Sequence, residues 1–119
     1  MKTIIVNRTV EIQVHEIMYL KGEGNYTHIF CSNGEKLIVS RTLKILEERI
    51  DDPSFIRINN NHVINLAFIV SCKKEGRKLS VFLGNDLNFD VSRRKTSTFR
   101  KELKIRHIKP IKEKSSSAN

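Results

Sequence analysis

The stretch TIIVNRTVEIQV, residues 3–14, carries the clearest structural pattern in the chain. In its second half, Val10, Ile12 and Val14 alternate with the polar residues Thr9, Glu11 and Gln13. A period of two places successive side chains on opposite faces of a strand, so that one face can pack on a core while the other faces water. The stretch therefore predicts a half-buried β-strand.

Further strand-like runs follow, at residues 17–20, 26–31, 36–39, 55–58, 68–72, 79–83 and 87–91. Turn-forming residues separate them at 22–25, 32–34, 75–76 and 84–86. These turns are rich in Gly, Asn and Asp, which tolerate positive φ or hydrogen-bond to their own backbone. The pattern predicts a meander of antiparallel hairpins, and so a mainly β fold.

Two segments have helical spacing. Residues 42–50 place Leu43, Leu46 and Ile50 on one face, and the following Pro53 cannot continue a helix. A second helix is predicted from an N-cap at Ser92 to about residue 104, with basic residues over most of its surface. We expect one folded domain over residues 1–104, containing one short internal helix and a C-terminal basic helix, and a basic, disordered tail over 105–119.

The charge of the chain is concentrated at one end. The 119 residues carry a net charge of +9, and residues 91–119 alone contain ten Lys and Arg against two Asp and Glu. A cationic end on a near-neutral body is typical of proteins that bind polyanions, because Lys and Arg neutralise phosphates and release counterions. A solvated basic tail would have the same composition.

The sequence offers little to support membrane insertion or catalysis. There is no long apolar stretch and no signal-peptide core, and Cys31 and Cys72 lie in apolar runs that suit reduced core residues of a cytoplasmic protein. His28 and Cys31 would point to opposite faces of a strand, and no phosphate loop or catalytic triad can be drawn. We expect no metal, no cofactor and no enzymatic activity.

Three polar segments embedded in strand-like sequence carry the functional signal, at residues 21–28, 57–65 and 91–95. Asn can pair with adenine edges and Arg with guanine edges, while Ser, Thr and Lys suit phosphates. Loops of this composition on a rigid sheet could read DNA. Taken singly, each segment is better explained by turn formation or by ordinary surface charge than by DNA reading.

The order of these segments resembles the LytTR-type DNA-binding domain of bacterial response regulators, over residues 10–103. The resemblance rests on EIMYL (16–20) before Asn25 and Tyr26, on RTLKIL (41–46), on FIRI (55–58) leading to VINL (63–66), and on VSRR (91–94). It implies an elongated, mostly β fold of small packed antiparallel sheets whose loops enter successive major grooves of double-stranded DNA. It also implies a sequence-specific transcription regulator of the two-component type, with a second copy on repeated half-sites as a further partner.

The family's base-reading and phosphate-contacting positions correspond to four segments of this chain. The candidate DNA-binding residues are Asn25, Thr27 and His28; Ser40, Arg41 and Thr42; Asn59, Asn60 and Asn61; and Ser92, Arg93, Arg94 and the adjoining Lys95. Where the family commonly shows His, Arg or Asn followed by Ser, this chain has three asparagines, so a phosphate contact there would be uncharged.

Other polar and aromatic residues are predicted to be structural. Asn65 is flanked by apolar residues, and a buried amide must be hydrogen-bonded, so we expect it to hold a tight connection rather than to touch DNA. Aromatic residues within strand-like runs are expected in the core; they are Tyr19, Phe30, Phe55, Phe68, Phe82 and Phe89.

Related proteins usually carry a receiver or sensor ahead of this domain, and residues 1–9 leave no room for one. We expect either a free-standing regulator, controlled by abundance, self-association or a partner, or a fragment of a longer protein. Two other classes fit the basic composition. One is a small RNA-binding or ribosome-associated β protein, which the low aromatic content of 7% disfavours. The other is a protein-interaction module with an incidental basic tail.

Overall fold

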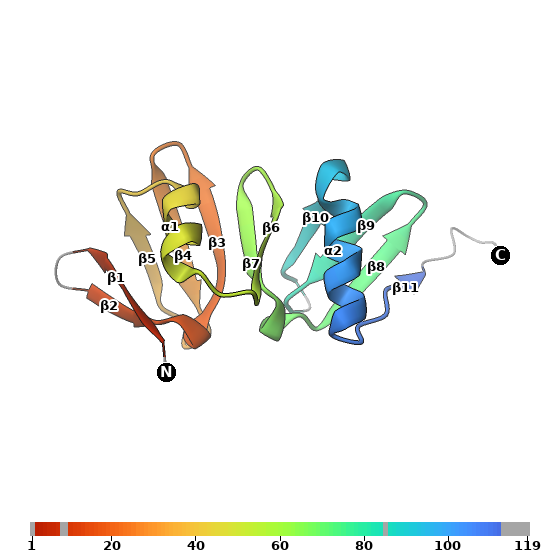
Figure 1. The fold of residues 1–119 in the computed structure, drawn as a ribbon, viewed down its shortest axis with the longest axis horizontal. Coiled ribbons are helices and arrows are strands. Elements are labelled where there is room, and N and C mark those ends of the chain that lie inside the picture. Colours follow the sequence, from red (N-terminus) through yellow and green to blue (C-terminus); the bar gives the residue numbers. More distant parts are fainter. Residues whose placement is uncertain (1, 8–9, 85, 113–119) are drawn as a thin grey trace. The chain divides into compact units, whose positions relative to one another are not determined.

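The computed structural model describes residues 2–7, 10–84 and 86–112, and the chain divides into two compact units, Met1–Ala67 and Phe68–Asn119 (Figure 1). The first unit contains five paired strands, a separate hairpin, a short 3-10 turn and one helix. In chain order these are β1 (Thr3–Asn7), β2 (Val10–Gln13), η1 (Val14–Glu16), β3 (Ile17–Glu23), β4 (Tyr26–Cys31), β5 (Lys36–Val39), α1 (Leu43–Ile50), β6 (Phe55–Asn59) and β7 (His62–Asn65).

The five paired strands of the first unit form an antiparallel sheet in the order β5-β4-β3-β7-β6. Strand β3 is central and pairs with β4 on one side and β7 on the other. β1 and β2 form a hairpin of their own. The meander predicted from the turn residues is therefore present, with β7 brought back beside β3.

Helix α1 and the β1–β2 hairpin share one hydrophobic core with the sheet. Leu43, Leu46 and Ile50 are buried along one side of α1, as their spacing predicted. Thr42 caps this helix, its hydroxyl oxygen accepting from the Ile45 amide at 3.4 Å, and Asp51 ends it in the left-handed region. The core also contains Ile4, Val6 and Ile12 from the hairpin and Ile17, Leu20, Ile29 and Val63 from the sheet.

The second unit is a smaller sheet with a long helix. Its elements are β8 (Ser71–Glu75), β9 (Lys78–Phe82), β10 (Asn88–Val91), α2 (Arg93–Ile105) and β11 (Ile111–Lys112), and the 3-10 turn η2 (Leu66–Phe68) precedes them. The sheet order is β10-β9-β8-β11, antiparallel except for β11, which runs parallel to β8. Phe99 and Leu103, one turn apart, are the buried residues of α2.

The predicted fold class is confirmed: small antiparallel sheets, one short internal helix and a basic C-terminal helix. Two details differ from the sequence-based expectation. Residues 3–14 form two strands of a hairpin and the start of η1 rather than one strand, and residues 66–68 form η2, so the strand predicted at 68–72 begins only at Ser71. Within the described residues, no helix is long and apolar enough to cross a membrane.

Part of the segment predicted as tail, residues 105–112, belongs to the second unit. Helix α2 runs to Ile105, and the Ile108 amide donates to the Leu103 carbonyl at 2.8 Å. The chain then pairs Ile111 with Lys73 of β8. From composition, this segment has few apolar side chains to bury. These backbone hydrogen bonds nevertheless hold it against the unit, and Ile108 is half-buried there. Residues 113–119 lie outside the described part.

Asn65 has the structural role predicted for it. It is 3% exposed, its amide nitrogen donates to the Ile17 carbonyl at 2.9 Å, and its oxygen accepts from the Ala67 amide at 3.0 Å. Both cysteines are buried thiols, and burial raises the pKa of Cys72 to about 11. Such a thiol is protonated at neutral pH, which suits the predicted core role.

The aromatic prediction holds only in part. Tyr19 and Phe89 are buried, whereas Phe30, Phe55, Phe68 and Phe82 are half-buried. On the face of the sheet opposite α1, the rings of Tyr19 and Phe30 stack with centroids 4.3 Å apart. Alternation gives the face of a strand but cannot tell whether another layer covers it.

Candidate nucleic-acid interface

Two polar turns lie at the same edge of the five-stranded sheet. One joins β3 to β4 at Gly24 and Asn25, and the other joins β6 to β7 at Asn60 and Asn61 (Figure 1). Their common position follows from β3, which pairs with both β4 and β7. The Gly22 amide also donates to the Asn61 carbonyl at 2.7 Å, so the turns are linked directly.

The segment Ser40–Arg41–Thr42 is held at this edge by Thr27. The hydroxyl of Thr27 donates to the Arg41 carbonyl at 2.7 Å, and Thr27 is fully buried. Thr27, a predicted DNA contact, is thus buried with its hydroxyl bonded inside the protein, where it holds the Arg41 backbone. Ser40 and Arg41 are exposed, while half-buried Thr42 caps α1.

Close packing of α1 against β3 depends on Gly22. A Cβ atom added at Gly22 would lie 3.2 Å from the Cβ of Leu43, tighter than most real contacts. The absent side chain therefore lets the first turn of α1 approach the strand. The sequence singled out Gly22 only as part of a turn.

The β3–β4 turn presents Asn25 and Tyr26 to solvent. Gly24 adopts φ +60, the left-handed geometry that a tight turn requires. Asn25 is exposed, and Tyr26 is 52% exposed. His28 is half-buried with its Nε2 2.8 Å from the Glu23 carboxylate, so this ring is held against β3. Tyr26 was missing from the predicted contact set, although its place beside the turn could have suggested it.

The β6–β7 turn is shaped by Arg57 and Asn59. The Arg57 guanidinium donates to the carbonyl of Asn59 at 3.3 Å, to that of Asn60 at 2.8 Å and to the Glu47 carboxylate at 3.1 Å. The side-chain oxygen of Asn59 accepts from the Asn61 amide at 2.8 Å. Asn59 therefore helps to build the turn, while Asn60 and Asn61 are exposed at its tip.

Arg57 was not among the predicted site residues, yet its guanidinium holds the β6–β7 turn through the carbonyls of Asn59 and Asn60. Its side chain is 29% exposed, and it is joined to α1 through Glu47. Its role depends on three partners that are distant in sequence or belong to the backbone. Nothing in the FIRI run distinguishes such a residue from an ordinary surface arginine.

His62 lies next to this turn, and the pKa of its ring reports on the burial and charge around it. Its ring nitrogen Nδ1 lies 3.0 Å from the Asn59 side-chain oxygen, and its β3 partner is Lys21. Burial, and then the Lys21 ammonium, lowers the pKa of His62 below its ordinary value of 6.5. The folded state therefore favours the neutral ring.

We expect the His62 ring to titrate below pH 6.5 in a proton NMR titration, and Lys21→Met to move its midpoint upward. Since the unfolded chain takes up this proton first as the pH falls, the contribution of His62 to stability is complete above about pH 6.5 and is lost as the pH falls through the folded pKa. A midpoint above 6.5 would contradict the environment described.

In the second unit, Arg93, Arg94 and Lys95 form the first turn of α2. Ser92 occupies the predicted N-cap position, but its side chain makes no capping hydrogen bond. Instead, its carbonyl accepts from the Thr96 hydroxyl at 2.9 Å and the Lys95 amide at 3.0 Å. Arg93 and Arg94 are exposed, and Lys95 is half-buried.

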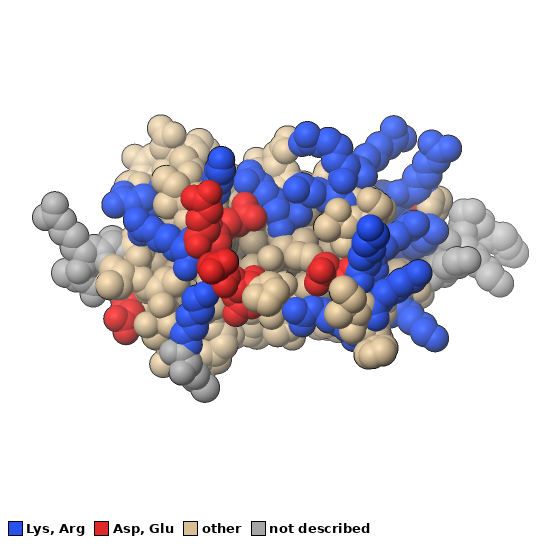
Figure 2. All heavy atoms as spheres, viewed as in Figure 1, with Lys and Arg blue, Asp and Glu red and all other residues tan. Residues whose placement is uncertain are grey.

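The distribution of charged side chains differs between the surfaces over α1 and over α2. Figure 2 shows Lys and Arg side chains gathered over α2 and the strands beside it in the second unit, whereas acidic and basic side chains lie together over α1 in the first. The exposed surface of α1 is therefore mixed in charge, with Lys44 and Arg49 beside Glu48, while the surface of α2 is suited to a polyanion. Among the described residues, no group of three or more His, Cys, Asp or Glu could hold a metal ion.

Residues 7–104 match the family model of the LytTr DNA-binding domain. The chain belongs to this family. Its fold is also that of a solved LytTr DNA-binding domain from Bacillus cereus, with a TM-score of 0.72 at 20% identity, covering 86% of this chain and 97% of that one.

Two curated proteins of Paraburkholderia xenovorans are similar to this LytTr chain in sequence. They are the heme-containing CO-sensing transcriptional regulators RcoM 2 and RcoM 1, which are 24% and 23% identical to it over 101 residues. The match covers 83% of this chain but only 38% of each regulator.

Proposed function

We propose that this LytTr chain binds double-stranded DNA with sequence specificity and regulates bacterial transcription. The observation that carries the proposal is the gathering of exposed amide and basic side chains at one edge of the first sheet in a chain of this family. Asn25, Arg41 and Asn60 come from three separate connections, and the hydrogen bonds of Thr27 and Arg57 hold two of those connections in place. Binding is the proposed activity, with no catalytic step.

The chemistry of each position suggests its role in the complex. The exposed amides of Asn25, Asn60 and Asn61 can pair with adenine edges or donate to phosphates, and both turns are narrow enough to enter a major groove. In the second unit, the guanidinium groups of Arg93 and Arg94 are suited to guanine edges. We propose that Ser40, Arg41 and Lys95 contact the phosphate backbone.

The residues with internal hydrogen bonds are given a supporting role in this proposal. Thr27 and Asn59 hold the connections that carry Arg41 and Asn60, and Thr42 caps α1. We further propose that two copies bind repeated half-sites and that the protein works in the cytoplasm, where chromosomal DNA is found. The two curated relatives are named as transcriptional regulators, which supports this reading.

Selection of bound sequences from a random duplex pool tests the proposal directly. We expect the pool to converge on one motif, and single-stranded RNA of the same length to compete poorly. Spacing between repeated motifs would report the second copy. Failure to converge, or preferential binding of single-stranded RNA, would overturn the proposed function.

Arg93 and Arg100 provide a matched pair of arginines on the same helix. If Arg93 reaches a guanine edge, Arg93→Ala should cost about 1–3 kcal/mol of binding free energy on the selected site and relax discrimination at one base pair. Arg100→Ala should weaken all duplexes alike, because a phosphate contact carries no sequence information. Fluorescence anisotropy on selected and scrambled duplexes measures both. Equal losses on both duplexes for the two variants would show that Arg93 does not read a base.

Asn60→Arg distinguishes a phosphate contact from a base contact at the tip of the β6–β7 turn. If Asn60 lies against a phosphate, the added charge should strengthen binding to every duplex and steepen the salt dependence by about one unit. We expect this result because members of the LytTr family commonly have a residue at this position that contacts the DNA backbone. Weaker binding to the selected site alone would instead identify Asn60 as a base reader. Unchanged binding to both duplexes would remove this turn from the interface.

A further inference from the structure

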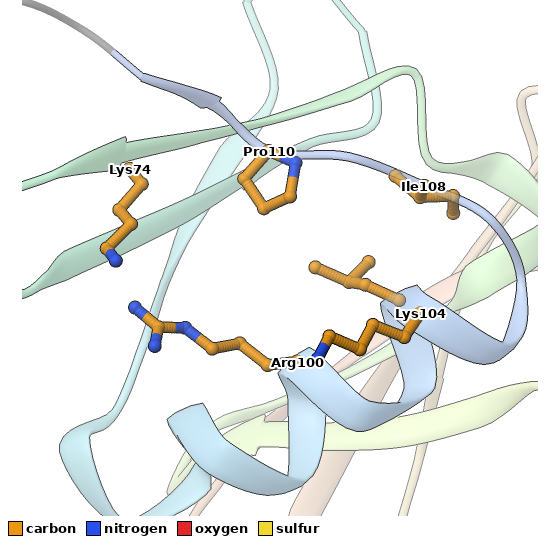
Figure 3. A pocket seen from close by; sticks show the side chains of 6 residues that line it. Lys74, Arg100, Lys104, Ile108 and Pro110 are labelled. Atoms are coloured by element: carbon orange, nitrogen blue, oxygen red, sulfur yellow. The ribbon is translucent and has the colours of Figure 1, made fainter.

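The second unit contains a pocket beside the C-terminal half of α2. It has a volume of about 250 Å³, and it is lined by α2, by β8 and by the segment that returns from α2 to β11 (Figure 3). The lining residues are Lys74, Arg100, Leu103, Lys104, Ile108 and Pro110.

The pocket is formed by defined backbone contacts. After α2, His107 adopts φ +60 and its amide donates to the Lys104 carbonyl at 3.0 Å, which reverses the chain. The Ile108 amide then donates to the Leu103 carbonyl at 2.8 Å, and beyond Pro110 the chain joins the sheet beside β8. Helix, returning segment and strand are thus tied together around the space.

The lining combines two kinds of chemistry. Figure 3 shows Lys74 and Arg100 pointing toward one another at one side of the pocket, with Ile108 and Pro110 on the other. Leu103 adds an apolar wall from the helix, and Lys104 a third cation. Of the described residues that line the space, none is acidic. An anion with an apolar body would meet complementary groups at both ends.

We propose that this pocket binds a small free monocarboxylate with an apolar body of about five or six carbons. The carboxylate would accept hydrogen bonds from Arg100 and Lys74, since a guanidinium can hold both oxygens at once. The hydrocarbon would lie against Leu103, Ile108 and Pro110. At about 30 Å³ for a water-sized group, the volume admits roughly eight to ten non-hydrogen atoms, which is the size of hexanoate or benzoate.

Occupancy would also affect DNA binding, a consequence that rests on the proposed function. Lys74 and Arg100 also line a neighbouring hollow of about 510 Å³ together with Arg77, Arg93 and Thr96. A bound carboxylate would neutralise part of this cationic surface next to Arg93, a proposed base reader. The site would therefore link the level of a small organic acid to the affinity for DNA.

Hexanoate is the probe for the site, titrated into the full chain and followed by amide NMR shifts in the absence of DNA. Acetate provides the charge without the apolar body, and 1-hexanol the body without the charge. We expect hexanoate to shift the amide resonances of Lys74, Arg100, Leu103 and Ile108 saturably. Both controls should bind at least about tenfold more weakly than hexanoate. Arg100→Gln should weaken hexanoate binding about tenfold, whereas Lys101→Gln, an exposed position on the same helix that does not line the pocket, should not.

Absence of saturable shifts, shifts centred elsewhere, or equal binding of acetate would overturn the proposed site. The effect on DNA is measured separately, as duplex affinity with and without hexanoate at constant ionic strength. A loss of affinity in the unmodified chain that is absent in Arg100→Gln would support the coupling. Hexanoate binding with unchanged DNA affinity would overturn the coupling and retain the site, and neither result depends on whether DNA binding is sequence-specific.

Discussion

Affinity for duplex DNA should fall about a thousandfold as monovalent salt rises from about 50 to 200 mM, if about six phosphates are contacted. Each phosphate neutralised by Lys or Arg releases condensed counterions, and salt removes the entropy gained from that release. The exposed cations Arg41, Arg93, Arg94 and Arg100 are among the groups able to make such contacts. Anisotropy titrations on one duplex at four or more salt concentrations would measure the slope.

The matched variant for this experiment is Arg41→Gln, which should reduce the slope by about one unit if Arg41 touches a phosphate as proposed. Glu48→Gln, at an exposed position on α1, should leave the slope unchanged, because a carboxylate neutralises no phosphate and so releases no counterions from DNA. A flat salt response in the unmodified chain would contradict a phosphate-contacting surface altogether.

Phe99→Ala should destabilise the second unit by about 3–5 kcal/mol, the cost of removing a fully buried aromatic side chain and leaving a cavity. Phe99 is 0% exposed, and with Leu103 it provides the buried side of α2. Because the unit is small, a loss of this size is a large part of the stability that it can have. Urea unfolding followed by NMR resonances of residues in β8–β10 would measure it.

Thr98→Ala is the control, since Thr98 is an exposed neighbour on the same helix and its replacement should change the unfolding midpoint little. A loss below about 1 kcal/mol in Phe99→Ala would mean that α2 is held by something other than its apolar face. The same variant should also weaken DNA binding, since the first turn of α2 carries Arg93 and Arg94.

Local patterns in the sequence determined the element types because each depends on neighbouring residues. Alternation over Val10–Gln13 predicted a strand, and the spacing of Leu43, Leu46 and Ile50 predicted α1 with its end before Pro53. The family resemblance, carried by four short segments in order, anticipated the fold class and the LytTr family. Neither the resemblance nor the pattern located the hairpin break within residues 3–14, because the period-two alternation covers only the second half of that stretch.

Burial and hydrogen bonding at the site required the tertiary structure, because their partners come from distant parts of the chain. The sequence predicted Thr27 as a DNA contact, whereas in the structure its hydroxyl donates a hydrogen bond to the Arg41 carbonyl, 14 positions away. Nothing in the sequence distinguished Arg57 from a surface arginine. Its structural role is visible only in its hydrogen bonds to Glu47 and to the β6–β7 turn.

The sequence by itself therefore determined a basic, mainly β chain of this family, since periodicity, turn residues and charge are properties of short segments. Only the tertiary structure decided which polar residues stay exposed. Pairing of β3 with both β4 and β7 places Asn25 and Asn60 at one edge of the sheet, and it turns Thr27 inward. The reversal after α2 likewise creates the pocket beside Arg100. The physical reason is that strand pairing and chain reversal join residues by backbone hydrogen bonds, whose partners no local pattern specifies.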